Sequence, residues 1–338
     1  MKIAIYHRQL ITCLTTLAVF VFQSCDDNAS YDVVGNPANI VYINTQEWTP
    51  INAPRNQYTF KITHTPVGDL GSVSAMFPVR STKPMDKATV IKSAVDSTLI
   101  DGYNEKYSTA CVSLPEGVIN LSKSSVTISE GQYISDDSIT VSIDSAKLAL
   151  LTDSAYLVPI RLTSVSESDV QINSEYNTTY LRINTVNTLI KDNAGSADMA
   201  GSLVTDYSAW TVTSTPASTV NTFENIFDGS TATFWQFGTS PVTIIVDMNE
   251  LKEMNGLRLF ARYASYGTSY IFSKVKVALS KDNSTFEDAG TATSSTMANE
   301  SGYQYIRFYN AEEARYIKLT LNWVSTYRSI CELGVYTK

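Results

Sequence analysis

Alternation of apolar and polar residues with a period of two recurs along most of this 338-residue chain. The strongest instance is an apolar stripe near the C-terminus, made of Ile317, Leu319, Leu321 and Trp323. Shorter instances occur at residues 40–43, 139–143 and 242–246. Side chains of a strand point alternately to its two faces, so each of these segments can bury one face against a core. The pattern predicts an all-β protein made of β-sandwiches.

The length of the chain fits two domains of ordinary size. The alternation is lost at residues 188–200, which we interpret as a linker between a first domain at 39–187 and a second at 201–338. Residues 90–99 have an ambiguous period and fit either a strand or one helical piece. With 20 Tyr and 17% charged residues, the composition is typical of secreted all-β proteins.

The N-terminus has the features of a targeting segment. Lys2 and Arg8 precede a short apolar run at residues 10–22, which is too short for a stable membrane span. The run ends at FQSC25, which resembles a bacterial lipobox. We therefore expect a signal peptide at 1–24, a lipidated Cys25 and a tether at 25–38; an ordinary secretory signal is the alternative. Asp26 and Asp27 follow directly and resemble a bacterial signal for display on the outer face of the outer membrane, so we expect a lipid-anchored protein that faces outside without spanning the membrane.

Charge and titratable residues restrict the function. The formal net charge of −8 argues against nucleic acid and against docking on anionic lipid. Beyond the leader, His64 is the single histidine available to a Ser-His-Asp or Cys-His arrangement. A pair of carboxylates for glycoside hydrolysis would meet only in space and stays open at this level. Cys111 and Cys331 are each flanked by apolar residues and favour two buried free thiols. We expect a protein that is not an enzyme.

Two segments of the second domain are characteristic. Residues 225–235 read NIFDGSTATFW, and residues 314–323 (ARYIKLTLNW) lead on to 330–336 (ICELGVY). Together they resemble the opening and closing signatures of the discoidin (coagulation factor 5/8 type C) family of galactose-binding-like β-sandwiches. The resemblance implies a discoidin-like jelly roll that binds a ligand without catalysis. It also implies core positions for Trp210 and Trp235.

The same segments suggest a structural Ca²⁺ ion. Asp228-Gly229-Ser230 is turn chemistry, and a turn rich in oxygen atoms suits a hard cation. The resemblance implies a carboxylate ligand from Asp228, a hydroxyl or carbonyl from Thr233 and a late acidic ligand. Its full set would be Asn225, Asp228, Ser230, Thr233, Cys331 and Glu332, with Asn225 and Cys331 offering backbone carbonyls. Ser230 departs from the family, in which Asp is common at that position.

Two loops combine aromatic rings with planar polar side chains, as sugar recognition requires. They are residues 262–270 (RYASYGTSY) and 324–328 (VSTYR). In discoidin-like carbohydrate modules, loops in these regions line the ligand face. The resemblance implies five ligand-binding candidates: Arg262, Tyr266, Tyr270, Tyr327 and Arg328.

The first domain has a resemblance of its own. Residues 95–104 (VDSTLIDGYN), 114–115 (LP), 125–131 (SVTISEG) and 156–160 (YLVPI) look, in this order, like an Ig-like lipoprotein domain of unknown function from the Bacteroidetes. In that family the domain is the membrane-proximal module of surface proteins. The resemblance implies a spacer and names no chemistry.

These observations predict a cell-surface carbohydrate-binding lipoprotein of a glycan-utilisation system. Its partners would be a glycan or polysaccharide and, at the membrane, an outer-membrane transporter and surface glycosidases. Two alternatives remain: an adhesin that binds a protein or host-matrix partner through the same loops, and an architectural subunit of a surface complex.

Overall fold

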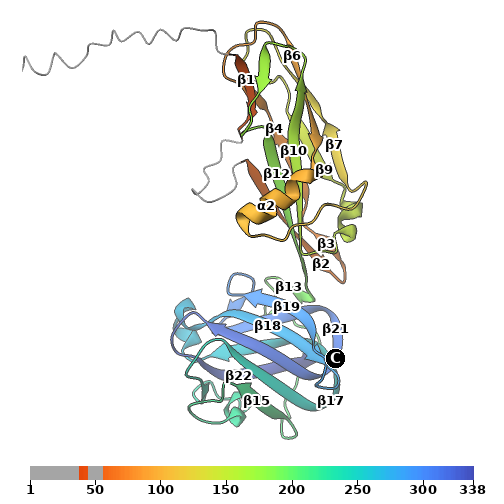
Figure 1. Cartoon of the computed structure of the whole chain (residues 1–338). Helices are drawn as coiled ribbons and strands as arrows, with labels where there is room; N and C mark the ends of the chain where they lie inside the picture. Colours follow the sequence, from red (N-terminus) through yellow and green to blue (C-terminus); the bar gives the residue numbers. More distant parts are fainter. Residues whose placement is uncertain (1–37, 45–55) are drawn as a thin grey trace, which may run out of the picture.

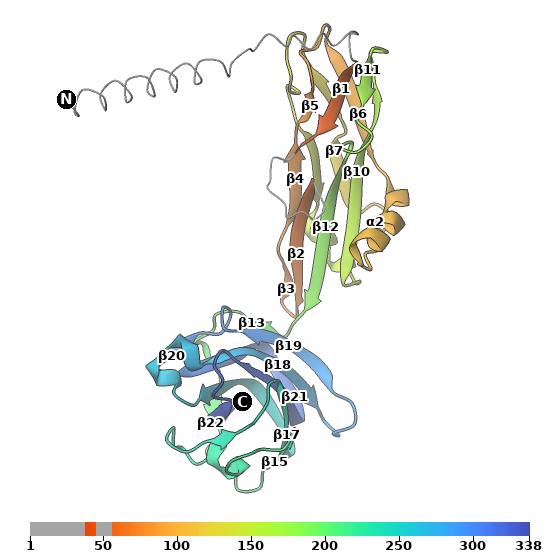
Figure 2. The same cartoon turned by 60° about the vertical axis from the view of Figure 1, so that its left-hand side comes forward.

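The computed structural model describes residues 38–44 and 56–338 (Figure 1). The expected signal peptide, the lipidation site Cys25 and almost all of the tether lie outside these residues. The described chain forms two β domains, and in both views the second lies beyond the end of the first that carries β2 and β3 (Figures 1 and 2). Within the described residues there is one α-helix, so the all-β prediction is confirmed.

The first domain contains twelve strands and three short helical segments. They are β1 (Asn39–Ile43), β2 (Gln57–Thr65), β3 (Gly68–Leu70), β4 (Val73–Phe77), β5 (Val79–Ser81), β6 (Thr89–Val95), η1 (Ser97–Leu99), α2 (Ile100–Tyr107), β7 (Ile119–Lys123), β8 (Ser125–Ile128), β9 (Ile139–Ile143), η2 (Ser145–Leu150), β10 (Ala155–Val165), β11 (Val170–Ile172) and β12 (Thr178–Asn187).

Three sheets share one core in this domain. A six-stranded sheet has the order β3-β2-β12-β10-β6-β8, and two three-stranded sheets have the orders β4-β9-β7 and β11-β1-β5. The core takes alternate residues from all three sheets, for example Ile183 of β12, Val141 of β9 and Val41 of β1. Two pairings, β2 with β12 and β1 with β11, are parallel. A hydrophobic pattern does not reveal such pairings, because it sets which face is buried and not the direction of the neighbouring strand.

The ambiguous stretch at residues 90–99 contains both kinds of structure. Strand β6 ends at Val95, and the Asp96 carboxylate then accepts a hydrogen bond from the Thr98 amide at 3.3 Å, starting η1 and α2. Buried Ile100 and Tyr103 of α2 join Cys111 and Leu157 in a small cluster separate from the main core. The helix therefore packs against the outside of the sandwich, and its two buried apolar residues are enough to hold it there.

The second domain contains ten strands and four single turns of 3₁₀ helix. They are β13 (Ile190–Lys191), η3 (Ser196–Asp198), β14 (Ser202–Leu203), β15 (Thr211–Thr215), η4 (Phe223–Ile226), β16 (Trp235–Gln236), β17 (Val242–Ala261), η5 (Ala264–Tyr266), η6 (Thr268–Tyr270), β18 (Phe272–Ser280), β19 (Glu287–Thr293), β20 (Asn299–Glu300), β21 (Tyr303–Trp323) and β22 (Ser329–Thr337).

Two long strands, β17 and β21, organise this domain. They pair with each other over most of their length, and the register breaks between Asp247 and Lys252. Before the break β17 also pairs with β15, and after it with β22, so one bent strand serves different neighbours in its two halves. The predicted stripe Ile317, Leu319, Leu321 and Trp323 faces the core. Residues 262–270 and 324–328 follow the C-terminal ends of β17 and β21, which places both loops on a rigid sheet.

The segment predicted as a linker packs against the second domain instead. The Leu189 amide donates to the Ala289 carbonyl at 2.8 Å, and the Tyr309 amide donates to the Leu189 carbonyl at 2.8 Å. Ile190 pairs with Phe308 in β13 and is 2% exposed within the second core. The prediction of a linker at 188–200 is therefore corrected: two apolar residues are too few to show a period, yet they suffice to join a sheet edge.

Ile190→Ala tests this correction. A buried isoleucine replaced by alanine leaves a cavity, so we expect the free energy of unfolding of the second domain to fall by at least about 2 kcal/mol. The neighbouring exposed Lys191→Ala is the control, for which a surface change of about 0.5 kcal/mol is expected. Urea denaturation followed by tryptophan fluorescence would measure both free energies of unfolding. Equally small losses for the two variants would show that Ile190 is not part of the second core and that residues 188–200 are a linker.

The described residues supply two further results. Cys111 and Cys331 are free and buried, as the sequence indicated. No helix in the described part of the chain has the length and apolar character needed to cross a membrane.

Candidate functional site

Four tyrosine rings gather where the two predicted loops meet. Tyr263 is the centre of this tyrosine cluster, with its ring centroid 6.0 Å from Tyr266, 5.9 Å from Tyr270 and 5.3 Å from Tyr327. Tyr270 and Tyr327 are also neighbours, at 6.0 Å. Tyr266 is 80% exposed and Tyr327 48% exposed. The structure thus brings three of the five predicted ligand-binding residues together on an open aromatic surface.

The backbone explains how the rings converge. Strand β17 ends beside β22, where Ala261 pairs with Ile330 and the Arg262 amide donates to the Ser329 carbonyl at 3.4 Å. Tyr263 then adopts a left-handed conformation with φ 66°, which turns the chain into η5. A left-handed tyrosine is uncommon and costs free energy that the surrounding structure must offset. Sequence reasoning missed Tyr263 as a member of the cluster, since a lone tyrosine gives no signal for positive φ.

The Tyr327 loop is held from beneath by a tryptophan. The Trp323 indole donates from Nε1 to the Ser329 carbonyl at 3.0 Å, bridging the two ends of residues 324–328. Its ring lies 5.4 Å from Phe272 and 6.2 Å from Phe237. The loop that carries Tyr327 is therefore anchored to the aromatic core through Trp323.

The two predicted arginines have partners within the protein. The Arg262 guanidinium lies 3.7 Å over the Phe234 ring and 4.7 Å over the Tyr263 ring. Arg328 donates from an η nitrogen to the Gly238 carbonyl at 2.6 Å. Both side chains brace the loops around the tyrosine cluster, and their contact with a ligand stays a prediction.

Four of the six residues predicted to bind Ca²⁺, Asn225, Asp228, Ser230 and Thr233, lie at one turn, and the other two, Cys331 and Glu332, lie in β22. Gly229 has φ 78°, as the Asp-Gly turn requires. The Asp228 carboxylate accepts from the Ser230 amide at 2.8 Å and from the Thr233 hydroxyl at 2.7 Å. Asn225 donates its side chain to the Phe234 carbonyl at 3.0 Å. The turn is thus already folded around Asp228 by its own hydrogen bonds.

Glu332 is the unusual member of this group. It is 6% exposed, and its Oε1 atom has no hydrogen-bond partner among the described residues. Burial raises the pKa of Glu332 to about 7, and the negative charge of Asp228 acts in the same direction. A cation beside these two carboxylates would neutralise the repulsion and satisfy Oε1, so the donor set fits a hard metal ion.

The remaining ligands would be neutral oxygen atoms. Burial raises the pKa of the Cys331 thiol to about 12, and a hard cation prefers oxygen ligands, so Cys331 would contribute its backbone carbonyl. Cys331 is skipped in the register between Ile330 and Glu332 against β17, as in a β-bulge, which can free a backbone group of its ladder partner. No cluster of three or more His, Cys, Asp or Glu residues occurs in residues 38–44 and 56–338, so hydroxyl and carbonyl oxygens would have to complete the coordination.

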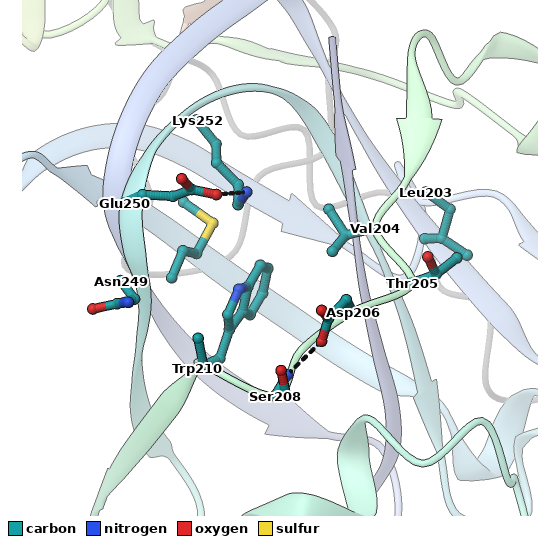
Figure 3. Close-up of a pocket in the computed structure, with 11 residues that line it drawn as sticks. Leu203, Val204, Thr205, Asp206, Ser208, Trp210, Asn249, Glu250 and Lys252 are labelled. Atoms are coloured by element: carbon teal, nitrogen blue, oxygen red, sulfur yellow. Dashed lines mark hydrogen bonds and ion pairs between the residues drawn. The ribbon is translucent and has the colours of Figure 1, made fainter.

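The two predicted core tryptophans are buried, Trp210 at 5% exposure and Trp235 at 4%. Trp210 forms the floor of a pocket of about 460 Å³ between residues 203–210 and the bend of β17 (Figure 3). Asp206 and Ser208 lie on one side of the indole and Glu250 and Lys252 on the other, each pair joined internally (Figure 3). Because the ring is nearly covered, it offers no stacking face, and the tyrosine cluster remains the stronger candidate.

His64 has two partners. Its Nδ1 lies 2.6 Å from an Asp69 carboxylate oxygen and its Nε2 2.8 Å from the Leu151 carbonyl. It lies far along the sequence from the tyrosine cluster, and its contact with Asp69 joins the two strands of the β2–β3 hairpin.

Comparisons with known proteins agree with this architecture. Residues 208–333 match the F5/8 type C domain family, and residues 36–169 match a family of N-terminal domains. A two-domain protein of unknown function from Bacteroides fragilis has the same fold over both domains, at 14% identity, covering 89% of this chain and 95% of its own, with a TM-score of 0.58. A comparison with curated proteins gave no match.

Other solved structures align with the second domain alone. A family 32 carbohydrate-binding module from Clostridium perfringens, solved in complex with galactose, is 20% identical over 38% of this chain and 93% of its own, with a TM-score of 0.32. A module of the same kind, in complex with 4,5-unsaturated mannuronic acid, is 23% identical over 39% and 95%, with a TM-score of 0.32. By the family match, residues 208–333 of this chain form an F5/8 type C domain, a non-catalytic type of module, behind a separate N-terminal β domain.

Proposed function

We propose that the second domain binds a glycan through the tyrosine cluster and that the protein is a non-catalytic carbohydrate-binding lipoprotein of the cell surface. The observation that carries this proposal is the exposure of Tyr266 and Tyr327, at 80% and 48%, on rings packed against Tyr263. An exposed tyrosine that is held in place offers a flat apolar face at little further cost in conformational entropy.

The chemistry of a sugar suits such a surface. A pyranose ring presents C–H groups on its faces and hydroxyl groups on its edge. The faces can lie on the rings of Tyr266 and Tyr327, while the tyrosine hydroxyls and nearby Ser265, Thr268 and Ser269 offer hydrogen bonds. Because Tyr266 and Tyr327 are largely open to solvent, we expect weak, repeated binding that retains a polysaccharide at the surface.

Calcium has a structural part in this proposal. Asp228, Glu332 and Thr233 would hold the ion, with the carbonyls of Asn225, Ser230 and Cys331. When bound, the ion supplies positive charge to two adjacent carboxylates and ties the 225–235 turn to β22. It would leave the tyrosine cluster free.

The cellular setting is proposed from the sequence. Lipidation of Cys25 would anchor the chain to the outer membrane, with the first domain as a spacer between the membrane and the glycan. A transporter of the outer membrane and surface glycosidases would be its functional partners.

Alanine substitution in the tyrosine cluster tests the proposal. We expect the intact chain to bind at least one member of an array of plant, microbial and mucin-type glycans. Tyr266→Ala and Tyr327→Ala should each weaken that binding about tenfold, the loss that follows when about 1–2 kcal/mol of stacking is removed. Isothermal titration calorimetry with the glycan found on the array would give the dissociation constants.

Tyr133→Ala is the matched control, because Tyr133 is 52% exposed and lies in the first domain. It should bind as the wild type does. Absence of any glycan ligand would reject the proposal and favour the adhesin or the architectural subunit, which a pull-down from outer membranes would separate. Binding that survives a chelator would leave calcium with a structural role alone.

A further inference from the structure

A second concave surface lies where the two domains meet. It has a volume of about 810 Å³ and takes its walls from both domains, which makes it an interdomain cleft. The first domain contributes residues of β2, β3 and β12, and the second contributes residues of β13, β18, β19 and β21. Figures 1 and 2 show where the two domains meet. Ligand sites are typically roughly 300–1,000 Å³ and occur often between domains.

The wall from the first domain is a row of neighbouring side chains across three strands. Thr63 of β2 pairs with Leu70 of β3 on one side and with Val186 of β12 on the other. Leu70 is 50% exposed and Val186 41% exposed, so two apolar side chains flank a hydroxyl on an open surface. Lys61 lies two residues before Thr63 and therefore on the same face of β2.

The wall from the second domain is polar. Lys274 of β18 pairs with Thr293 of β19, and Thr291 follows on the same face of that strand. Tyr309 also lines the cleft and is half-buried, and its hydroxyl can donate a hydrogen bond. One wall thus offers apolar side chains beside a hydroxyl group, and the other offers further hydroxyl groups.

The lining of the cleft carries two lysines, Lys61 and Lys274, and two aspartates, Asp192 and Asp288. Asp288 lies 2.8 Å from the Lys276 ammonium and accepts from the Gly290 amide at 2.9 Å, so its charge is offset. Lys61 and Lys274 have no hydrogen-bond or ion-pair partner among the described residues, and Asp192 is the one remaining carboxylate of the lining. Two uncommitted ammonium groups stand out in a chain of formal net charge −8.

Hydrogen bonds at Thr188 hold the two walls of the cleft next to each other. Thr188, at the joint, donates its amide to the His64 carbonyl of the first domain at 3.0 Å and its hydroxyl to the Ala289 carbonyl of the second at 3.4 Å. A Cβ atom at Gly290 would lie 2.2 Å from the Thr188 hydroxyl, so the backbone of β19 and residue Thr188 are in close contact here. Because Thr188 is hydrogen-bonded to both domains, it should limit the movement of one domain relative to the other.

We propose that the interdomain cleft is a second saccharide site, selective for an anionic oligosaccharide whose carboxylate or sulfate groups pair with Lys61 and Lys274. The C–H face of a sugar ring lies on Leu70 and Val186, and its hydroxyls meet Thr63, Thr291 and Tyr309. Charge complementarity distinguishes this ligand from the one at the tyrosine cluster, where both arginines already have partners within the protein.

The test uses the intact chain carrying Tyr266→Ala and Tyr327→Ala, so that binding at the tyrosine cluster does not contribute. Titration calorimetry would compare an oligogalacturonate tetramer, a chondroitin sulfate tetrasaccharide and neutral cellotetraose. We expect an anionic ligand to bind and to weaken as salt is raised. Adding Lys61→Gln with Lys274→Gln should weaken it about tenfold or more, since two charge-assisted contacts are lost.

Lys87→Gln with Lys92→Gln is the matched control, because it removes the same charge from exposed first-domain positions outside the cleft. It should leave the dissociation constant within about twofold. Binding of the uronate alone or of the sulfated sugar alone would identify the anionic group. The proposal is overturned if neither anionic ligand binds, if cellotetraose binds as well as they do, or if the control pair causes the same loss.

Discussion

Trp323→Ala is expected to destabilise the second domain by about 3–5 kcal/mol, as removal of a buried tryptophan does. The ring lies 7% exposed against Phe272 and Phe237, and its Nε1 hydrogen bond closes the loop that carries Tyr327. The variant therefore loses both the packing of the core and the support of the tyrosine cluster. Urea denaturation followed by circular dichroism would measure the loss, together with the binding of any glycan found for the wild type.

Trp323→Phe separates the two contributions. It keeps most of the ring but loses the bond to the Ser329 carbonyl, so we expect a smaller loss of about 1–2 kcal/mol with glycan binding weakened more than stability alone explains. Val324→Ala is the control at the next position, where the side chain is 52% exposed, and should change stability by about 0.5 kcal/mol or less. Equal effects of Trp323→Ala and Val324→Ala would show that the loop does not rest on the tryptophan.

The strands could be predicted because burial on one face imposes a period of two. The stripe 317–323 is one example, and its alternate residues enter the second core as expected. The joint could not be predicted in this way. Leu189 and Ile190 are two apolar residues in a polar segment, and their place in the sheet depends on Phe308, more than a hundred residues later. Local pattern carries no information about such a partner.

The candidate site could also be predicted only in part. Tyr266, Tyr270 and Tyr327 were predicted from their loops and are close together in the structure. Tyr263 connects them, but its part depends on a left-handed backbone that the sequence RYAS does not signal. The interdomain cleft was missed for another reason. Lys61 and Lys274 line one cleft only when the two domains lie end to end.

The second large expected effect comes from Glu332. We expect it to make the free energy of unfolding depend on pH, and we expect calcium to abolish this dependence. The unfolded chain releases the Glu332 proton near the ordinary pKa of 4.5, whereas the folded protein keeps it until about pH 7. Between these values the folded state binds more protons than the unfolded state, so its free energy of unfolding falls as the pH rises. The difference of about 2.5 pKa units corresponds to about 3 kcal/mol.

Glu332→Gln removes this ionisation with little change of shape. We expect the metal-free variant to equal the wild type near pH 4.5 and to exceed it by about 3 kcal/mol at pH 8, because the wild type alone must bury a charge beside Asp228. Calcium at pH 8 should raise the melting temperature of the wild type and leave the variant nearly unchanged. Glu250→Gln is the control, since Glu250 is 69% exposed. A wild-type protein whose stability is flat from pH 5 to 8 would mean that Glu332 is solvated in solution, and the absence of a calcium shift in the wild type would remove the ion from this turn.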